Sequence, residues 1–304
     1  MNNLLEETET VKLQDPTTKY PAPPFEKQQE IPVPGEEKDL YPKADHGEES
    51  YRGTDKLKGR KAVVTGADSG IGKAVAIAFA REGADVVIAY LSDKEDEDAR
   101  DTARWVEEAG RKAILFKGDL SKAENCQKLV ATAVDGLGHI DLLVNNAAYQ
   151  MAQEGIEDIS NDQWDHTYAT NIHSMFYLSK AAIPHMPPGS SIINTTSVNA
   201  YDPTPLLLDY ASTKGAIQNF TSNLAQSLLQ NGKGIRVNAV APGPIWTPLI
   251  PSTMPNYKEF GDNTPMKRPG QPIEVSPIYV FLASEDASYI AGATIPVTGG
   301  RVTI

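Results

Sequence analysis

Residues 59–90 read GRKAVVTGADSGIGKAVAIAFAREGADVVIAY, and this stretch decides the fold. Two short apolar runs, 61–65 and 85–90, enclose a segment at 70–82 in which apolar residues recur at helical spacing. The loop TGADSGIG, residues 65–72, joins the first run to the helix. Gly66 permits a tight turn there, and Gly70 and Gly72 let a pyrophosphate approach the free amides of the helix N-terminus. The stretch therefore predicts a strand–loop–helix unit that binds a dinucleotide.

The same alternation of strand and helix continues to the end of the chain. The expected strands are 61–65, 85–90, 112–116, 141–145, 190–195, 235–240 and 293–297, and the expected helices lie near 70–82, 95–109, 122–136, 161–184, 210–231 and 272–284. The strand runs are apolar nearly throughout, which is typical of a sheet covered by helices on both faces. We predict an α/β fold, a doubly wound parallel sheet of the Rossmann type, as one domain over residues 56–304.

Residues 1–55 differ from the rest in composition. They contain thirteen acidic and six basic residues and seven prolines. Prolines interrupt helices, and so polar a segment has little apolar surface to bury. We expect an extended or disordered tail that has enough apolar residues, such as Phe25 and Ile31, to dock on a surface of this chain or of a neighbour.

Composition excludes several classes of function. The net charge of −12 and the lack of a basic stripe argue against a nucleic-acid partner. Cys126 is the only cysteine and the five histidines have no ligand spacing, so we expect neither a disulfide nor a metal site. The N-terminus MNNLLEETET lacks the features of a signal peptide, and no run reaches the ~18 apolar residues of a membrane span. We expect a cytoplasmic protein without membrane attachment.

Further motifs follow the glycine loop in a fixed order. They are GDL at 118–120, NNAA at 145–148, TNIHSMF at 170–176, INTTSVNA at 193–200, YASTK at 210–214 and VAPGPIWT at 240–247. Together with the loop, they resemble the short-chain dehydrogenase/reductase family over about residues 57–300. The chain is most similar to a bacterial subgroup with a proline-rich N-terminal extension, whose members are regarded as NAD(P)-dependent aldehyde or alcohol oxidoreductases.

The resemblance implies that Ser197, Tyr210, Lys214 and Asn171 carry out catalysis. Tyr210 is expected to be the general acid in carbonyl reduction, and Lys214, one helical turn later, to lower the pKa of the phenol and hold the nicotinamide ribose. Ser197 is expected to hydrogen-bond the substrate oxygen. Asn171 is expected to hold a water that passes protons to the lysine. The alternative for Asn171 is an amide paired with a neighbouring backbone carbonyl.

The resemblance also implies a cofactor site. Its residues are Gly66, Asp68, Ser69, Gly70, Ile71, Gly72, Tyr90, Leu91, Asp119, Leu120, Asn146, Ala147, Ala148, Tyr210, Lys214, Pro242, Gly243, Ile245 and Thr247. Asp119 is expected to contact adenine, or else to cap a helix that starts at Ser121. The cofactor is NAD or NADP. The lack of a basic residue beside Leu91 and the charge of Asp68 slightly favour NAD, whereas the subgroup resemblance favours NADP.

The expected substrate is a small aldehyde, ketone or alcohol. Its pocket is predicted from Gln150, Asn199, Tyr201, Leu206, Leu207 and Trp246, with segment 246–268 as a mobile lid. The resemblance implies a homotetramer, and removal of residues 1–50 is expected to leave cofactor affinity unchanged. The alternative functions are a non-catalytic dinucleotide sensor and a stress-related scaffold. A sensor does not need all four catalytic residues, so we favour the oxidoreductase.

Overall fold

A parallel sheet of seven strands forms the centre of the computed structural model, which describes residues 13–301. The spatial order of the strands is β3-β2-β1-β4-β5-β6-β7. Their bounds are β1 Lys61–Thr65, β2 Asp85–Tyr90, β3 Ala113–Lys117, β4 Leu142–Asn145, β5 Ser191–Thr195, β6 Arg236–Pro242 and β7 Thr294–Val297. The strand order reverses between β1 and β4, which places a crevice beyond the carboxyl ends of these strands.

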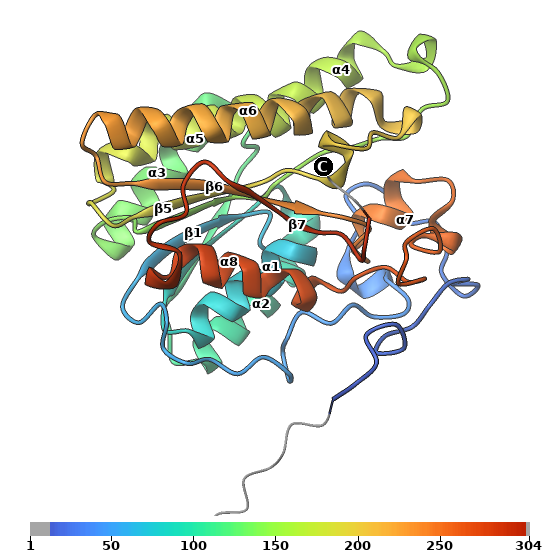
Figure 1. Cartoon of the computed structure of the whole chain (residues 1–304), viewed down its shortest axis with the longest axis horizontal. Helices are drawn as coiled ribbons and strands as arrows, with labels where there is room; N and C mark the ends of the chain where they lie inside the picture. The colour runs from blue at the N-terminus through green and yellow to red at the C-terminus, as the bar shows by residue number, and fades with distance from the viewer. Residues whose placement is uncertain (1–12, 302–304) are drawn as a thin grey trace, which may run out of the picture.

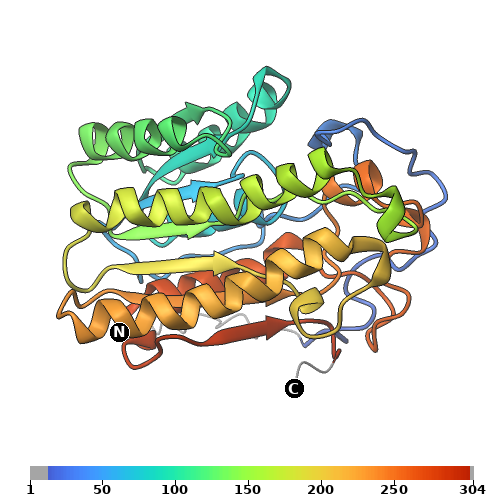
Figure 2. The same cartoon turned by 90° about the horizontal axis from the view of Figure 1, so that it is seen from above.

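Helices cover both faces of the sheet (Figure 1). On one face lie α1 Gly70–Arg81, α2 Asp96–Glu108 and α8 Pro272–Ala283, and on the other lie α3 Ala123–Leu137, α5 Ser174–Ala182 and α6 Leu208–Gln230. Seen from above, α3, α5 and α6 lie side by side over the sheet and run roughly along its strands (Figure 2). The predicted doubly wound single-domain fold is confirmed.

The core consists of two apolar layers because successive strand residues point to opposite faces of the sheet. Val64 and Ile88 pack on the side of α1 and α8, while their neighbours Val63 and Val87 pack on the other side. All four side chains are fully buried. This double burial is the reason why the strands appear in the sequence as uninterrupted apolar runs.

The helix predicted at 161–184 is broken in the structure. Helix α4, Asn161–Tyr168, continues into a π-helical stretch, Ala169–His173, before α5 begins at Ser174. Asn171 lies within that stretch, and single π-helical turns often occur at functional sites. A short helix not expected from the sequence, α7 Leu249–Thr253, follows β6.

Residues 13–55, which we call the arm, lie extended along the domain of their own chain (Figure 1). Their only helical turn is Glu37–Asp39. Phe25 and Leu40 are buried in a small cluster with Trp246 and Ile250, which belong to the segment after β6. The expected docking surface for these residues is thus on the same chain. Residues 1–12, which include the whole MNNLLEETET sequence, and the final residues 302–304 lie outside the described part.

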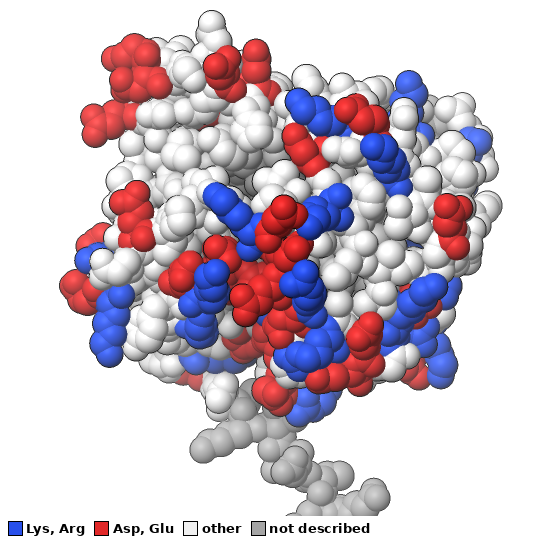
Figure 3. Space-filling view, turned by 180° about the vertical axis from the view of Figure 1, so that it is seen from behind, with Lys and Arg blue, Asp and Glu red and all other residues white. Residues whose placement is uncertain are grey.

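Charged side chains of both signs are mixed on the face shown in Figure 3. Lysines and arginines there lie among aspartates and glutamates and do not form a continuous basic stripe. A phosphate backbone is bound through such a stripe. Within residues 13–301, no helix is long and apolar enough to cross a membrane.

Candidate active site

A cavity of about 430 Å³ lies beyond the carboxyl ends of the strands. Its wall is formed by the loops that follow β1, β2, β3, β4, β5 and β6, together with part of α6 and the segment after β6. Its volume is in the range of small-molecule and cofactor sites. Its position is the one expected from the reversal of strand order between β1 and β4.

The glycine loop forms the floor of the cavity at the start of α1. Gly66 and Gly70 have φ values of +59° and +51°, which favour glycine. Gly72 does not line the cavity, and its predicted role in the approach of a pyrophosphate stays a prediction. A Cβ at Gly72 would lie 1.9 Å from the carbonyl oxygen of Gly66, so this glycine lets the loop pack closely on the helix.

Carboxylates gather where β2 ends. Asp68 and Glu95 are both buried and both line the cavity beside Tyr90 and Leu91. Burial, followed by the charge of Glu95, raises the pKa of Asp68 well above its usual range. Glu95 Oε2 accepts hydrogen bonds from the backbone N–H of Leu91 at 3.0 Å and of Ser92 at 2.8 Å. Sequence reasoning missed Glu95.

The loops after β3 and β4 close the next part of the wall. Asn146 Nδ2 donates to the carbonyl oxygen of Thr65 at 3.0 Å, which ties this loop to the end of β1. Asp119 Oδ1 accepts from the N–H of Ser121 at 2.9 Å, and α3 begins two residues later, at Ala123. Asp119 therefore stabilises the turn before the helix while it also lines the cavity.

Ser197, Tyr210 and Lys214 meet at the other end of the cavity. Ser197 follows β5, and the other two residues lie one turn apart on α6. The Nζ atom of Lys214 lies 5.0 Å from the centre of the Tyr210 ring and donates to the carbonyl oxygen of Thr195 at 2.9 Å. Ser197 Oγ accepts from the Asn199 backbone N–H at 3.1 Å and from Asn199 Nδ2 at 3.4 Å. Its own proton is thereby left to donate elsewhere.

We expected a lowered pKa for Tyr210, and this expectation is wrong when only the groups of the protein itself act on the phenol. Burial raises the pKa of Tyr210 to about 12, and the Ser197 hydroxyl offsets only part of this rise. Burial also lowers the pKa of Lys214 to about 7, so its amine is only partly protonated at neutral pH. The phenol therefore stays protonated, which is the state a general acid needs.

Asn171 does not line the cavity. Its Oδ1 accepts from the N–H of Tyr149 at 2.7 Å, and its Nδ2 donates to the carbonyl oxygen of Tyr149 at 2.9 Å and to Thr213 Oγ1 at 3.1 Å. This is the backbone pairing considered as the alternative for this residue. The role of Asn171 in holding a water stays a prediction.

All predicted catalytic and cofactor-binding residues except Gly72 and Asn171 line this one cavity. Of the predicted substrate pocket, Gln150, Asn199, Leu206 and Leu207 also line it, together with His166, Thr170 and Thr253. Tyr201 and Trp246 do not. Trp246 is fully buried beneath the arm, where its Nε1 donates to the carbonyl oxygen of Pro42 at 2.8 Å.

The arm also contributes to the cavity wall, through Val33, Pro34 and Gly35. The sequence does not predict this position of the arm, because the arm packs on the domain through contacts between residues far apart in the chain. For Glu95 a signal did exist. Ser92 and Glu95 form a capping box, a pattern that could have singled out this glutamate from the acidic run 93–98.

The wall fits a dinucleotide on chemical grounds. Glycines with positive φ bring the backbone close to the cavity at a helix N-terminus, where the helix dipole and the N–H groups of the first turn favour phosphate; of these groups, the N–H of Gly70 donates to Glu37 Oε1. The carboxylates at the end of β2 suit ribose hydroxyls. Among the described residues, no group of three or more histidine, cysteine or acidic side chains is arranged to bind a metal ion.

Comparison with known proteins gives consistent matches. Residues 66–301 match the family described as enoyl-(acyl carrier protein) reductase. General stress protein 39 of Bacillus subtilis is 51% identical over 270 residues, 88% of this chain and 93% of that protein. NADPH-dependent aldehyde reductase 1, chloroplastic, of Arabidopsis thaliana is 46% identical over 284 residues, 91% of this chain and 98% of that protein. The crystal structure of a short chain dehydrogenase from Burkholderia cenocepacia in complex with NADP aligns with a TM-score of 0.75 and 30% identity, over 81% of this chain and 98% of the other.

Proposed function

The chain belongs to the short-chain dehydrogenase/reductase family of NAD(P)-dependent oxidoreductases, and we propose that within this family it reduces small aldehydes. The observation that carries the proposal is the single cavity that joins the glycine loop to Ser197, Tyr210 and Lys214. The similarity to a relative named as an aldehyde reductase supports the substrate class. Small ketones, and alcohols in the reverse direction, are related substrates under this proposal.

Tyr210 is proposed to supply the proton of the reaction. When bound, the reduced nicotinamide supplies the hydride that adds to the carbonyl carbon. The phenol of Tyr210 donates its proton to the carbonyl oxygen, so that C=O becomes CH–OH. A pKa of about 12 keeps this proton on the phenol until negative charge develops on the substrate oxygen.

Ser197 and Lys214 are proposed to assist Tyr210 in different ways. The backbone N–H and the side-chain amide of Asn199 donate to the Ser197 oxygen. The hydroxyl can therefore donate its own proton to the substrate oxygen. Lys214 lies beside the phenol, and its ammonium form stabilises the phenolate that remains after proton transfer. With a pKa of about 7, the same ammonium can release a proton that restores the phenol.

For the cofactor we propose NAD in preference to NADP. Among the described residues that line the cavity, the only lysine and arginine are Lys214 and Arg301, and Arg301 is paired with Asp202 at 2.6 Å. Asp68 and Glu95 place carboxyl groups at the end of β2, where the ribose 2′-hydroxyl is expected. A 2′-phosphate would meet these acidic groups without a cation to balance it.

We also propose a homotetramer in the cytoplasm. Phe176 on α5 and Leu229 on α6 are 47% and 46% exposed, and an interface built over these two helices would cover them. Light scattering at micromolar concentration tests the assembly, and a monomer would contradict it. Cell fractionation tests the location.

A turnover assay tests whether the chain is an aldehyde reductase. The purified full-length chain is mixed with a panel of small aldehydes and with NADH or NADPH, and the loss of reduced nicotinamide is followed by absorbance. We expect oxidation of the cofactor that depends on the aldehyde. Binding of cofactor without turnover of any aldehyde, ketone or alcohol would instead indicate a dinucleotide sensor.

A further inference from the structure

Residues 33–37 of the arm lie against the part of the cavity where β2 and the glycine loop meet. Val33, Pro34 and Gly35 belong to the cavity wall, together with Leu91 and Glu95. Gly35 packs so closely on the segment after β6 that a Cβ there would lie 2.4 Å from the carbonyl oxygen of Pro248. The arm therefore connects the cavity wall after β2, at Leu91 and Glu95, with the segment after β6, at Pro248.

Hydrogen bonds fix the arm on both sides of this span. On one side, Ile31 donates its N–H to the carbonyl oxygen of Pro251 at 3.2 Å. On the other, Glu37 donates its N–H to Asp98 Oδ2 at 2.9 Å, and its Oε1 accepts from the N–H of Gly70 at 2.8 Å. Gly70 is the first residue of α1 and lies in the glycine loop, so the arm directly contacts the loop expected to hold phosphate.

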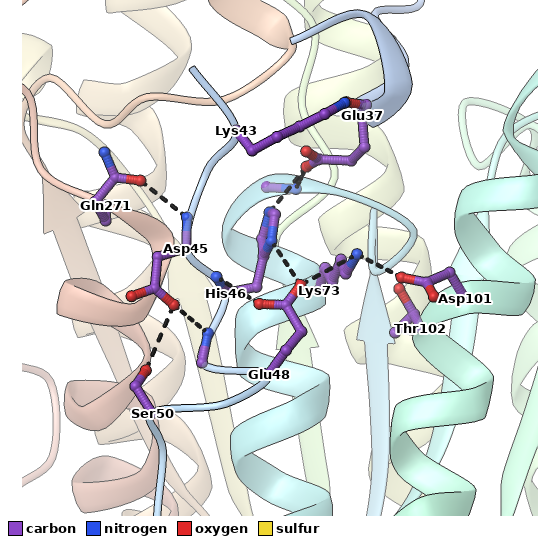
Figure 4. Close-up of polar contacts among 12 residues, drawn as sticks. Glu37, Lys43, Asp45, His46, Glu48, Ser50, Lys73, Asp101, Thr102 and Gln271 are labelled. Carbon is purple, nitrogen blue, oxygen red and sulfur yellow. Dashed lines mark hydrogen bonds and ion pairs between the residues drawn. The ribbon is translucent and has the colours of Figure 1, made fainter. Parts of the chain in front are cut away.

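A buried charge network holds the side chain of Glu37 in place (Figure 4). His46 Nε2 lies 2.9 Å from Glu37 Oε1, and His46 Nδ1 lies 3.1 Å from Glu48 Oε1. Lys73 of α1 lies 3.4 Å from the same oxygen of Glu48 and 2.8 Å from Asp101 of α2. Glu37 and His46 are 8% and 3% exposed. The carboxylate at Gly70 is thus balanced by a cation and held rigidly.

We propose that residues 33–37 of the arm are part of the dinucleotide site, with Val33, Pro34 and Gly35 as its outer wall and Glu37 as a positioning residue that holds the glycine loop through Gly70. The proposal rests on the dinucleotide site of the proposed function and adds the arm to it. The arm then slows the escape of the bound dinucleotide and increases affinity by keeping the loop in its binding geometry. This replaces the expectation from the sequence that removal of residues 1–50 leaves cofactor affinity unchanged.

The test measures binding of NADH and NADPH to full-length variants by fluorescence titration, with dissociation rates from stopped flow. Glu37→Ala removes the acceptor for the N–H of Gly70, and we expect the Kd of both dinucleotides to rise about tenfold or more. Glu37→Gln keeps an oxygen acceptor and should recover part of the affinity. Gly35→Val should displace the wall and accelerate dissociation. Glu26→Ala, an exposed carboxylate on the same arm, is the matched control and should bind as the wild type does.

Two readouts separate a positioning role from a general loss of structure. At saturating cofactor, the kcat of Glu37→Ala should stay within about twofold of wild type while the KM for cofactor rises. In the wild type, NADH should also slow hydrogen exchange at residues 31–37, a measurement that needs no variant. Unchanged exchange there, or wild-type Kd values in both Glu37→Ala and Gly35→Val, overturns the proposal. A wild type that binds neither dinucleotide would instead refute the proposed function.

Discussion

Lys214 Nζ lies 5.0 Å from the centre of the Tyr210 ring, within one turn of α6, and is fixed there by the carbonyl oxygen of Thr195. Burial changes the two side chains in opposite directions, raising the pKa of the phenol to about 12 and lowering that of the ammonium to about 7. The pair therefore consists of a strongly held proton beside an easily released one. This difference suits a phenol that donates a proton and a lysine that restores it.

Tyr210→Phe removes the phenolic proton and little else. Aldehyde reduction should fall by about a thousandfold or more, because a positioned general acid contributes about 10²–10⁴-fold. The Kd for NADH should stay close to wild type. Tyr201→Phe is the control, since Tyr201 is exposed and lies outside the cavity wall. Activity of Tyr210→Phe within about tenfold of wild type, a barrier change of only ~1.4 kcal/mol, would remove Tyr210 from its assigned role.

Lys214 should give aldehyde reduction a pH dependence near neutrality. Its lowered pKa of about 7 means that Nζ is charged below this pH and neutral above it. The charged form stabilises the phenolate and supplies the restoring proton, so kcat/KM should fall as pH rises through about 7. Lys214→Arg stays protonated and should be less active but lack this fall. A variant profile with the same fall would assign it to another group.

The sheet and the glycine loop could be predicted because their signals are local. Apolar runs such as 61–65 follow from burial on both faces, and Gly66 follows from the backbone conformation of the turn itself. Tyr210 and Lys214 could be placed together because a helix puts positions i and i+4 on one face.

The rest depended on contacts that no local pattern specifies. The π-helical stretch around Asn171 has the same apolar spacing as an ordinary helix, so the sequence predicts one continuous helix there. The capping box with Ser92 distinguishes Glu95 from its acidic neighbours, but that its carboxylate lines the cavity follows only from the fold. The docking of Glu37 on Gly70 joins residues 33 positions apart and follows from the arrangement of the whole arm.

Glu95→Gln should improve binding of NADPH relative to NADH. The substitution removes the negative charge while leaving an oxygen to accept from the N–H groups of Leu91 and Ser92. In the wild type, NADPH should not bind more than about tenfold more tightly than NADH, roughly the value of one charge-assisted hydrogen bond. In Glu95→Gln, the ratio should move about tenfold toward NADPH. Fluorescence titration with both dinucleotides measures the two ratios.

The control for this change is Glu97→Gln, which removes an exposed carboxylate two residues away. An equal shift of the ratio in this variant would show that the effect comes from net charge rather than from the position of Glu95. A hundredfold preference of the wild type for NADPH would show that a cation reaches the 2′-phosphate, and Lys94, 3.4 Å from the carbonyl oxygen of Val33, would be the first candidate.

His46 should make the stability of the folded chain depend on pH in the alkaline range. Burial opposes its charge, but Glu37 and Glu48 outweigh that effect and raise the pKa of His46 from its usual value near 6.5 to about 9. A raised folded-state pKa means that the folded chain binds the proton more tightly than the unfolded chain. The stabilisation is therefore fully present below about pH 6.5 and is lost as pH rises through about 9. Its size is on the order of 3 kcal/mol, since each tenfold change in proton affinity corresponds to about 1.4 kcal/mol.

Urea unfolding between pH 6 and pH 9.5 measures this loss. His46→Gln should be less stable than wild type near neutrality, because Glu37 and Glu48 lose their shared cation and only Lys73 remains beside Glu48. The variant should also show a flatter dependence on pH, so that its free energy of unfolding approaches that of the wild type near pH 9.5. His139→Gln is the matched control, because His139 lies on the surface, 45% exposed beside Asp141, and this variant should keep the wild-type slope. If His46→Gln retains the wild-type slope, the alkaline loss comes from other groups and His46 does not carry a proton between its two carboxylates.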